Sequence, residues 1–302
     1  MPIDLFATVL DCNGRALVLD RPRVVGVINL TPDSFSGDGL HDNVEAALAQ
    51  GLRMVEEGAD MLDVGGESTR PGADELSVEE ELRRVLPVIE QLVARTILPI
   101  AIDTSRPEVM RAAVAAGAGM VNDIRALRGE GAMDAVAELG VPVCLMHMQG
   151  EPHSMQDDPR YDDVVGEVHR FLTDRLFACE LAGIDRRKVM VDVGFGFGKT
   201  LEHNLALLAA LERFGSLGSG VYAGLSRKAM IGALTGRAHS ADRTAGSVAA
   251  ALIAAQRGAR MLRVHDVAMT VDALAVWNAV HAVDAVPRRD EKTAAPRWPD
   301  DD

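Results

Sequence analysis

The 302-residue chain is poor in cysteine, in basic charge and in long apolar runs, and each shortage excludes a class of protein. Its cysteines, Cys12, Cys144 and Cys179, are odd in number and form no CxxC pair, which predicts inert thiols rather than a disulfide framework or a zinc knuckle. Lys and Arg number 31 against 45 Asp and Glu, a net charge of −14. A nucleic-acid-binding protein carries a basic face, so this balance argues against one.

The sequence also lacks membrane and export signals. No window offers about 18 apolar residues without charge, and the first ten residues have no basic region followed by an apolar stretch. We therefore expect a cytoplasmic protein that has neither a membrane nor a nucleic acid as partner. The acidic balance repels anions, so an anionic substrate would need a few local Arg, Lys, His or metal groups to attract it.

Eight short apolar runs alternate with longer amphipathic segments between residue 24 and about residue 282. Such runs suit strands that are buried on both faces, and strands alternating with helices predict a parallel sheet. A closed barrel and a long doubly wound sheet both remain open, but polar residues at the carboxyl ends of nearly all runs favour the barrel. We predict a (β/α)8 TIM barrel with strands at 24–30, 61–66, 99–104, 119–124, 142–148, 189–194, 221–226 and 261–266.

The two ends of the chain differ from this pattern. Residues 6–20 alternate around Asn13-Gly14, a dipeptide typical of a type I′ hairpin turn, and we expect an N-terminal hairpin that caps the bottom of the barrel. Residues 287–302 are charged and rich in proline and lack an apolar period, which predicts a disordered tail. Residues 1–286 are then expected to form a single domain.

Polar residues stand at the carboxyl ends of the predicted strands, where (β/α)8 enzymes carry their chemistry. Buried carboxylates and amides need partners, and so many around one rim indicate a site. Arg263 and His265 are two residues apart and point to the same side, so together they could hold an anion; a salt bridge from Arg263 to an acidic neighbour is the alternative. The rim comprises Asn29, Asp63, Asp103, Asn122, Met146, His147, Asp192, Lys228, Arg263 and His265.

Two loops after strands carry further signals. Residues 192–200 read DVGFGFGKT, which fails the GxxxxGK[ST] phosphate-loop pattern because position 193 is Val193, so we predict a tight glycine loop close to a ligand. Residues 63–72 are bounded by Pro and Gly and filled by hydroxyls and Arg, as expected of a binding loop. The Ser-Arg-Lys run at 226–228 follows the seventh strand, a place where barrels often bind phosphate.

Taken together, these segments resemble the dihydropteroate synthase family of pterin-binding barrels. The resemblance covers about residues 24 to 280 and runs in the family's order. One segment departs from it: loop one reads SFSGDG where the family has SFSDGG, so Asp38 stands one position later. The matching segments are GVINLTPDSFS (26–36), LDVGGESTRPGA (62–73), IDTSRPEV (102–109), VNDI (121–124), LMHMQGEP (145–152), DVGFGFGKT (192–200), GLSRKAMIG (224–232) and RVHDV (263–267).

The resemblance implies the condensation of a dihydropterin diphosphate with 4-aminobenzoate in folate synthesis, by a homodimer that is a target of sulfonamides. It implies that Asp63 and Asp103 stabilise a pterin-derived cation, and that Mg²⁺ bridges the diphosphate to Asn29. It also implies that Lys228, Arg263 and His265 act with Mg²⁺ in catalysis by stabilising the departing diphosphate. The other implied substrate contacts follow. The pterin edge would meet Asp103, Asn122, Asp192 and Lys228, with Met146 and Phe197 as apolar walls, and the diphosphate would meet Asn29, Arg263 and His265. Ser226 is a further substrate-binding residue, and Asp38, Ser68, Thr69, Arg70 and Pro71 would come from loops one and two.

Three alternatives stay open on the sequence alone. A pterin-binding methyltransferase domain shares the barrel and the early Asn-x-Thr-Pro-Asp-Ser-Phe pattern, but it does not normally combine the STRPG loop with SRK and RVHD. A paralogue could bind pterin without catalysing the condensation. A non-enzymatic scaffold predicts that the polar rim only satisfies itself.

Overall fold

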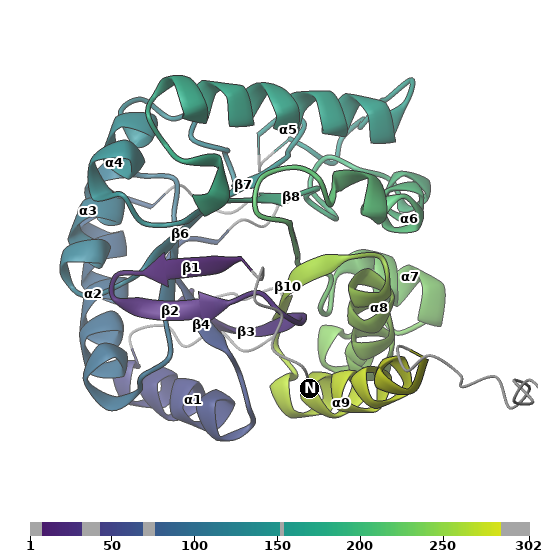
Figure 1. Cartoon of the computed structure of the whole chain (residues 1–302), viewed down its shortest axis with the longest axis horizontal. Helices are drawn as coiled ribbons and strands as arrows, with labels where there is room; N and C mark the ends of the chain where they lie inside the picture. The colour runs from purple at the N-terminus through teal and green to yellow at the C-terminus, as the bar shows by residue number, and fades with distance from the viewer. Residues whose placement is uncertain (1–7, 32–42, 69–75, 152–153, 285–302) are drawn as a thin grey trace, which may run out of the picture.

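Eight parallel strands close into a barrel in the computed structural model, which describes residues 8–31, 43–68, 76–151 and 154–284 (Figure 1). Around the barrel the strand order is β10-β3-β4-β5-β6-β7-β8-β9, so each strand pairs with its neighbours in sequence and the last closes on the first. The predicted TIM barrel is confirmed. Its strands are β3 (Arg23–Asn29), β4 (Met61–Gly65), β5 (Ile100–Asp103), β6 (Met120–Asp123), β7 (Val143–Met146), β8 (Val189–Asp192), β9 (Val221–Ala223) and β10 (Ala259–Val264).

Helices surround the barrel (Figure 1), and several begin at a side chain that caps the first turn. The Ser77 hydroxyl accepts from the backbone N–H of Glu80 at the start of α2, and the Asp163 carboxylate does so from Gly166 at the start of α5. None of the helices in the described ranges is both long and apolar enough to span a membrane. They are α1 (Val44–Glu56), α2 (Val78–Arg95), α3 (Pro107–Ala115), α4 (Ala132–Leu139), α5 (Val164–Leu181), α6 (Leu201–Ala209), α7 (Ala229–Thr235), α8 (Thr244–Gln256) and α9 (Val267–Asp284), with short 3-10 turns at Arg186–Lys188, Leu211–Phe214 and Ser240–Arg243.

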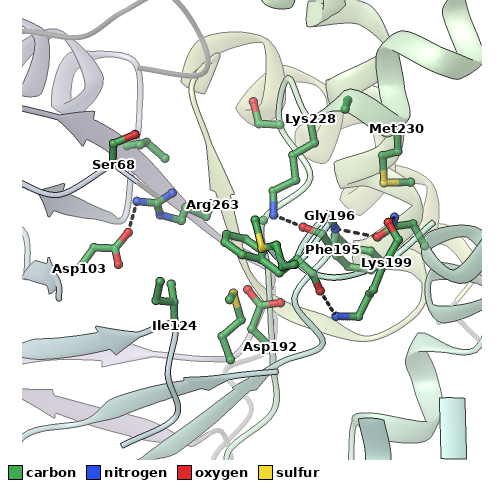
Figure 2. A pocket seen from close by; sticks show the side chains of 18 of the residues that line it. Ser68, Asp103, Ile124, Asp192, Phe195, Gly196, Lys199, Lys228, Met230 and Arg263 are labelled. Carbon is green, nitrogen blue, oxygen red and sulfur yellow. Dashed lines mark hydrogen bonds and ion pairs between the residues drawn. The ribbon is translucent and has the colours of Figure 1, made fainter. Parts of the chain in front are cut away.

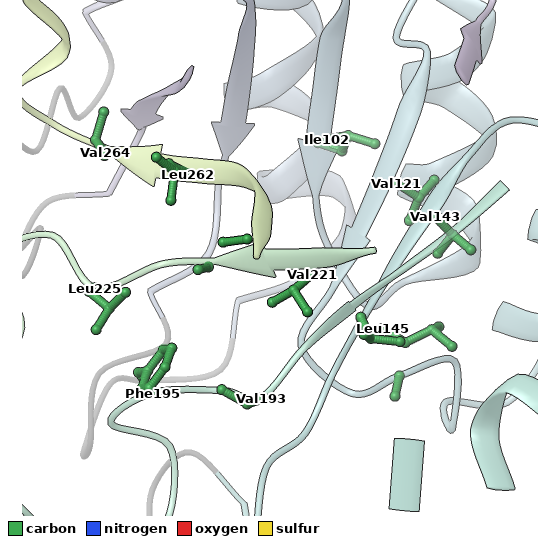
Figure 3. Close-up of a cluster of buried hydrophobic side chains, with 14 of the residues drawn as sticks. Ile102, Val121, Val143, Leu145, Val193, Phe195, Val221, Leu225, Leu262 and Val264 are labelled. Carbon is green, nitrogen blue, oxygen red and sulfur yellow. The ribbon is translucent and has the colours of Figure 1, made fainter. Parts of the chain in front are cut away.

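The outward faces of the strands form the main core against the helices (Figure 3). Side chains such as Ile102, Val121, Leu145 and Leu262 are fully buried there. The large apolar content of the strands is thereby explained, since each strand has one face in this core and the other inside the barrel.

The inward faces change character along the strands. Met61, Met120, Met190 and Met261 lie in a buried cluster at the lower end of the barrel. Side chains two residues further on point to the same interior. Four of these positions are polar: Asp63, Asn122, Asp192 and Arg263.

A two-stranded hairpin seals the lower end. Strands β1 (Val9–Cys12) and β2 (Arg15–Val18) pair antiparallel, and Asn13 and Gly14 between them have φ of 56° and 81°, as a type I′ turn requires. Leu10 and Leu17 join the buried cluster of strand starts. The predicted hairpin cap is therefore confirmed for the described residues.

The three cysteines are free and buried, as predicted. Burial raises the pKa of the Cys12 thiol to about 12, so this thiol stays protonated at neutral pH.

The seventh barrel strand is shorter than the sequence predicts. The apolar run covers 221–226, but β9 ends at Ala223. The chain then turns, with Arg227 at φ 59° and its N–H bound to the Ser247 hydroxyl, so Ser226 and Lys228 lie in the loop after the strand.

Some predicted features lie outside the described residues. They are Asp38, Thr69, Arg70, Pro71 and the predicted tail at 287–302.

Candidate active site

A cavity of about 400 Å³ lies at the carboxyl ends of the barrel strands (Figure 2). It brings together most of the residues that the sequence predicts for the site. Asp63 is not among the lining residues, because its side chain is fully buried beneath them. The predicted residues that line the cavity are Asn29, Ser68, Asp103, Asn122, Met146, Asp192, Phe197, Ser226, Lys228, Arg263 and His265.

Arg263 joins two carboxylates at the base of the cavity. Its Nε donates to Asp63 Oδ2 at 2.5 Å and its Nη2 donates to Asp103 Oδ2 at 2.8 Å. The same Asp63 oxygen accepts from Asn122 Nδ2 at 3.1 Å and from the Tyr222 hydroxyl at 3.4 Å. The salt bridge that the sequence left as an alternative for Arg263 is thus present, and Asp63 orients both Arg263 and Asn122.

This cluster places two carboxyl groups and one guanidinium in a largely buried space. Burial raises the pKa of Asp103 to about 7, with the Asp63 carboxylate adding to the rise and Arg263 opposing it. The two carboxylates hold the pKa of Arg263 above its usual value, against the effect of burial. Asp103 can therefore change its protonation state near neutral pH while Arg263 stays charged.

Lys228 and Asp192 both line the cavity and influence each other electrostatically. Lys228 Nζ donates to the Phe195 carbonyl and lies 4.6 Å from the centroid of the Phe197 ring, a cation–π distance. Burial lowers the pKa of Lys228 to about 8, with Asp192 opposing the shift, and burial also raises the pKa of Asp192. Asp192 Oδ1 accepts from the N–H of Gly194 at 2.7 Å, which fixes the carboxylate.

Ser226 and His265 lie next to each other at the cavity edge. The His265 N–H donates to Ser226 Oγ at 3.2 Å, and the ring Nδ1 lies 2.9 Å from the same oxygen. Ser226 therefore orients the imidazole that faces the cavity, a role that its place in the Ser-Arg-Lys run did not reveal. Arg227 points away and pairs with Asp266 at 2.7 Å.

One wall of the cavity is apolar. Met146 packs in a buried cluster with Met148 and Met155, and Ile124 and Phe197 pack against it. Met146 and Phe197 thus take the place expected of apolar walls, whereas the sequence analysis assigned no site role to Met155 or Ile124. Methionine fills irregular gaps and adapts to a flat ring, which suits a cavity wall.

The side chains of the cavity could bind a metal ion only together with a substrate that supplies further ligands. Among the residues that the structure describes, no group of three or more His, Cys, Asp or Glu side chains is placed to hold a metal. Asn29 does line the cavity at the end of β3. Mg²⁺ usually keeps several waters and binds through few protein ligands plus substrate phosphates, so one amide oxygen fits that mode.

Sequence reasoning missed several lining residues. Lys199 is buried and its Nζ donates to the Gly194 and Phe197 carbonyls, so it is directed into its own loop. This geometry agrees with rejecting a phosphate loop there. Gln156 follows no strand directly and reaches the cavity from the segment before α5, where its amide donates to the Gly196 carbonyl. No local pattern marks such a residue.

The fold and the site together define a class. The chain is a (β/α)8-barrel enzyme, and its cavity combines an apolar wall, a polar edge of carboxylates, amide and ammonium, and a corner with Arg263 and His265. Such a cavity suits a flat ring with alternating donors and acceptors that carries an anionic group.

Comparisons with known proteins agree. The pattern of the pterin-binding enzyme family matches residues 25–265. Over 270 residues the chain is 50% identical to the dihydropteroate synthase of Escherichia coli strain K12, covering 89% of this chain and 95% of that protein. The chain therefore belongs to the dihydropteroate synthase family of pterin-binding enzymes.

Solved structures are similar over the whole barrel. The Xanthomonas albilineans dihydropteroate synthase with 4-aminobenzoic acid has 66% identity and a TM-score of 0.86, covering 91% of this chain and 99% of that chain. The same enzyme in complex with 7,8-dihydropteroate has 63% identity and a TM-score of 0.82 at the same coverage. A Yersinia pestis dihydropteroate synthase in a sulfonamide drug complex has 46% identity and a TM-score of 0.88, also over 91% and 99% of the two chains.

Proposed function

We propose that this protein condenses 6-hydroxymethyl-7,8-dihydropterin diphosphate with 4-aminobenzoate to give 7,8-dihydropteroate and diphosphate, a step of folate biosynthesis. The observation that carries the proposal is the convergence of Asp103, Asn122, Asp192 and Lys228 on one cavity that also holds Arg263. The relatives named dihydropteroate synthase favour this reaction over that of a methyltransferase domain.

The polar wall is suited to hold the pterin ring. A pterin edge alternates N–H donors with N and O acceptors, which matches carboxylates at Asp103 and Asp192, an amide at Asn122 and an ammonium at Lys228. Met146 and Phe197 would cover the ring faces. Because Asp192 is held by the Gly194 N–H, its carboxylate is already oriented before the ring arrives.

The reaction breaks the C–O bond between the pterin methylene and the diphosphate, and the electron pair leaves with the diphosphate oxygen. Arg263 and His265 lie where they can bind the departing charge. Two of the five N–H donors of Arg263 contact Asp63 and Asp103, and these contacts fix the orientation of the guanidinium group. The Asp63 and Asp103 carboxylates stabilise the positive charge that develops on the pterin side.

The 4-aminobenzoate nitrogen then forms the C–N bond with the methylene carbon and loses one proton. An arylamine is weakly basic, so solvent or the released diphosphate can take this proton and no strong general base is required. No covalent enzyme intermediate is needed. Ser68 lies at the cavity and is the described residue of the loop that we assign to the aminobenzoate side.

We assign Mg²⁺ as the cofactor and Asn29 as its protein ligand. When bound, the ion would neutralise part of the diphosphate charge, which lowers the cost of its departure. In a protein of net charge −14 such local positive charge offsets the long-range repulsion of the substrate.

Beyond the single chain, we propose a cytoplasmic homodimer. Its support is a set of exposed apolar side chains on the last three helices, where solvent would otherwise meet apolar surface. They are Leu234 on α7, Ile253 on α8, and Met269, Val276 and Val280 on α9.

The proposed reaction is tested by mass spectrometry of the purified protein with the dihydropterin diphosphate, 4-aminobenzoate and Mg²⁺. We expect dihydropteroate and diphosphate in equal amounts, and only when both substrates and Mg²⁺ are present. Asp192→Asn serves as the matched variant, because it keeps the size of the side chain and removes one charge from the pterin wall. Retained pterin binding without product would instead identify a silent paralogue.

A further inference from the structure

The loop after β8, residues 193–198, approaches the neighbouring backbone unusually closely. Gly194, Gly196 and Gly198 have φ of 69°, 80° and 60°, in the left-handed region that favours glycine. A Cβ at Gly194 would lie 1.9 Å from the His147 carbonyl oxygen, and one at Gly198 would lie 2.4 Å from that of Gln149. The loop therefore packs directly against the backbone that follows β7. Contacts from other side chains are needed to keep it in this position.

Lys199, the next residue, makes such contacts. Its side chain is 3% exposed, and Nζ lies 2.9 Å from the carbonyl oxygens of both Gly194 and Phe197. Nζ also lies 3.0 Å from Nδ1 of His147, whose pKa burial lowers to about 2, so the imidazole is neutral. Burial lowers the pKa of Lys199, with Asp192 opposing the shift, and Nζ has at least two N–H donors in either protonation state, enough for the Gly194 and Phe197 carbonyls.

The same loop presents the polar wall of the cavity on its other side. The Phe195 carbonyl accepts from Lys228, and Figure 2 shows Lys228 and Lys199 on either side of the backbone that carries Phe195 and Gly196. The Phe197 ring lies under the Lys228 ammonium, 4.6 Å from its centroid to Nζ. One buried lysine thus fixes the loop on which these contacts depend.

We propose that Lys199 is a positioning residue for pterin binding. It turns the Gly194 and Phe197 carbonyls inward, so that Asp192, the Phe197 ring and Lys228 face the ring site. Lys199 borders the cavity, but its Nζ is directed toward the Gly194 carbonyl of its own loop. The inference rests on the proposed function only in that the ring is taken to be a pterin.

The experiment compares Lys199→Met with the wild type by calorimetric titration of a pterin monophosphate, which binds without turnover. Methionine has a similar length and removes the Nζ donors, so we expect pterin affinity to fall by about tenfold or more, as for the loss of a buried hydrogen-bonding group. The Michaelis constant for the dihydropterin diphosphate should rise, whereas that for the aminobenzoate should change much less. Lys188→Met is the control, since Lys188 Nζ also donates to a backbone carbonyl, that of Gly140, but away from the cavity.

Lys199→Gln separates positioning from general stability. Its amide has two N–H donors and can retain the Gly194 and Phe197 carbonyls, so it should recover part of the pterin affinity that Lys199→Met loses. It also replaces Lys199→Met should that variant not fold. Wild-type pterin affinity in a folded Lys199→Met, or equal losses for pterin and aminobenzoate that follow the melting temperature, would overturn the proposal.

The two proposals fail separately. A wild-type protein that binds pterin but forms no dihydropteroate refutes the proposed reaction, while the titrations still decide the role of Lys199. A wild-type protein that binds no pterin refutes both.

Discussion

At the scale of single residues, the contacts of Arg263 show what the sequence alone does not predict. The sequence predicts this residue at the carboxyl end of its strand, and it does line the cavity. Its partners Asp63 and Asp103 stand 200 and 160 residues away in sequence. Only barrel closure brings them together, so a sequence pattern can place the three residues on one rim but cannot assign which of them contact one another.

Lys199 and Ser226 show a related limit. Both stand in segments that resemble the family, yet their roles depend on the direction of the side chain. Lys199 points into its own loop and Ser226 toward His265. The direction of Ser226 is set by a turn at Ser226 and Arg227, where Arg227 has φ 59°, and the residue types there do not predict that conformation.

The pKa values of Lys228 and Asp103 predict a bell-shaped dependence of kcat/KM on pH. The carboxylate of Asp103, whose pKa is about 7, increases as pH rises, so binding of pterin N–H groups should strengthen through neutral pH. The ammonium of Lys228, whose pKa is about 8, is lost as pH rises further, so kcat/KM should then fall. These limbs report groups of the free enzyme, and steady-state kinetics across a pH range that extends about two units beyond each value would resolve them.

The variant that isolates the alkaline limb is Lys228→Arg. Arginine stays protonated over this range, so the fall above a pH of about 8 should disappear even if the maximal rate is reduced. An unchanged alkaline limb in Lys228→Arg would show that another group titrates there.

At the scale of elements, the barrel could be predicted well because short apolar runs and period-3.6 helical patterns are local. Strands buried on both faces read as short apolar runs, and Asn13-Gly14 marks the hairpin turn directly. The prediction for the seventh strand is too long, because Leu225 and Ser226 continue its pattern after the backbone has turned away. The contacts of the hairpin with the strand starts could be inferred only from the topology.

The hairpin makes a prediction that separates stability from function. Leu10 is 1% exposed and packs at the lower end of the barrel, opposite the cavity. Leu10→Ala should therefore reduce the free energy of unfolding by about 2–5 kcal/mol, as large-to-small core substitutions do, while the Michaelis constants for both substrates stay unchanged. Urea unfolding and steady-state kinetics measure the two effects.

Val9→Ala provides the control on the same strand, since Val9 is 55% exposed. It should shift stability by much less than Leu10→Ala. A raised Michaelis constant in Leu10→Ala would mean that the two ends of the barrel are coupled, contrary to the separation of the hairpin from the site.

At the scale of the whole molecule, the net charge and the barrel architecture determine which groups the site needs and where they lie. The chain carries −14 overall, yet the cavity collects Lys228, Arg263 and His265 at the carboxyl ends of the strands. The barrel makes this possible because it separates an apolar lower interior from a polar upper one along the strands. Family, fold and reaction class could be predicted from sequence, whereas the internal pairing of the site required the folded chain.

The most direct measurement of the central claim is a crystal structure of the protein with a pterin monophosphate. We predict the ring edge against Asp103, Asn122 and Asp192, with Lys228 in contact and the phosphate toward Arg263 and His265. A pterin bound outside this cavity, or with its phosphate directed away from Arg263, would contradict the proposed site.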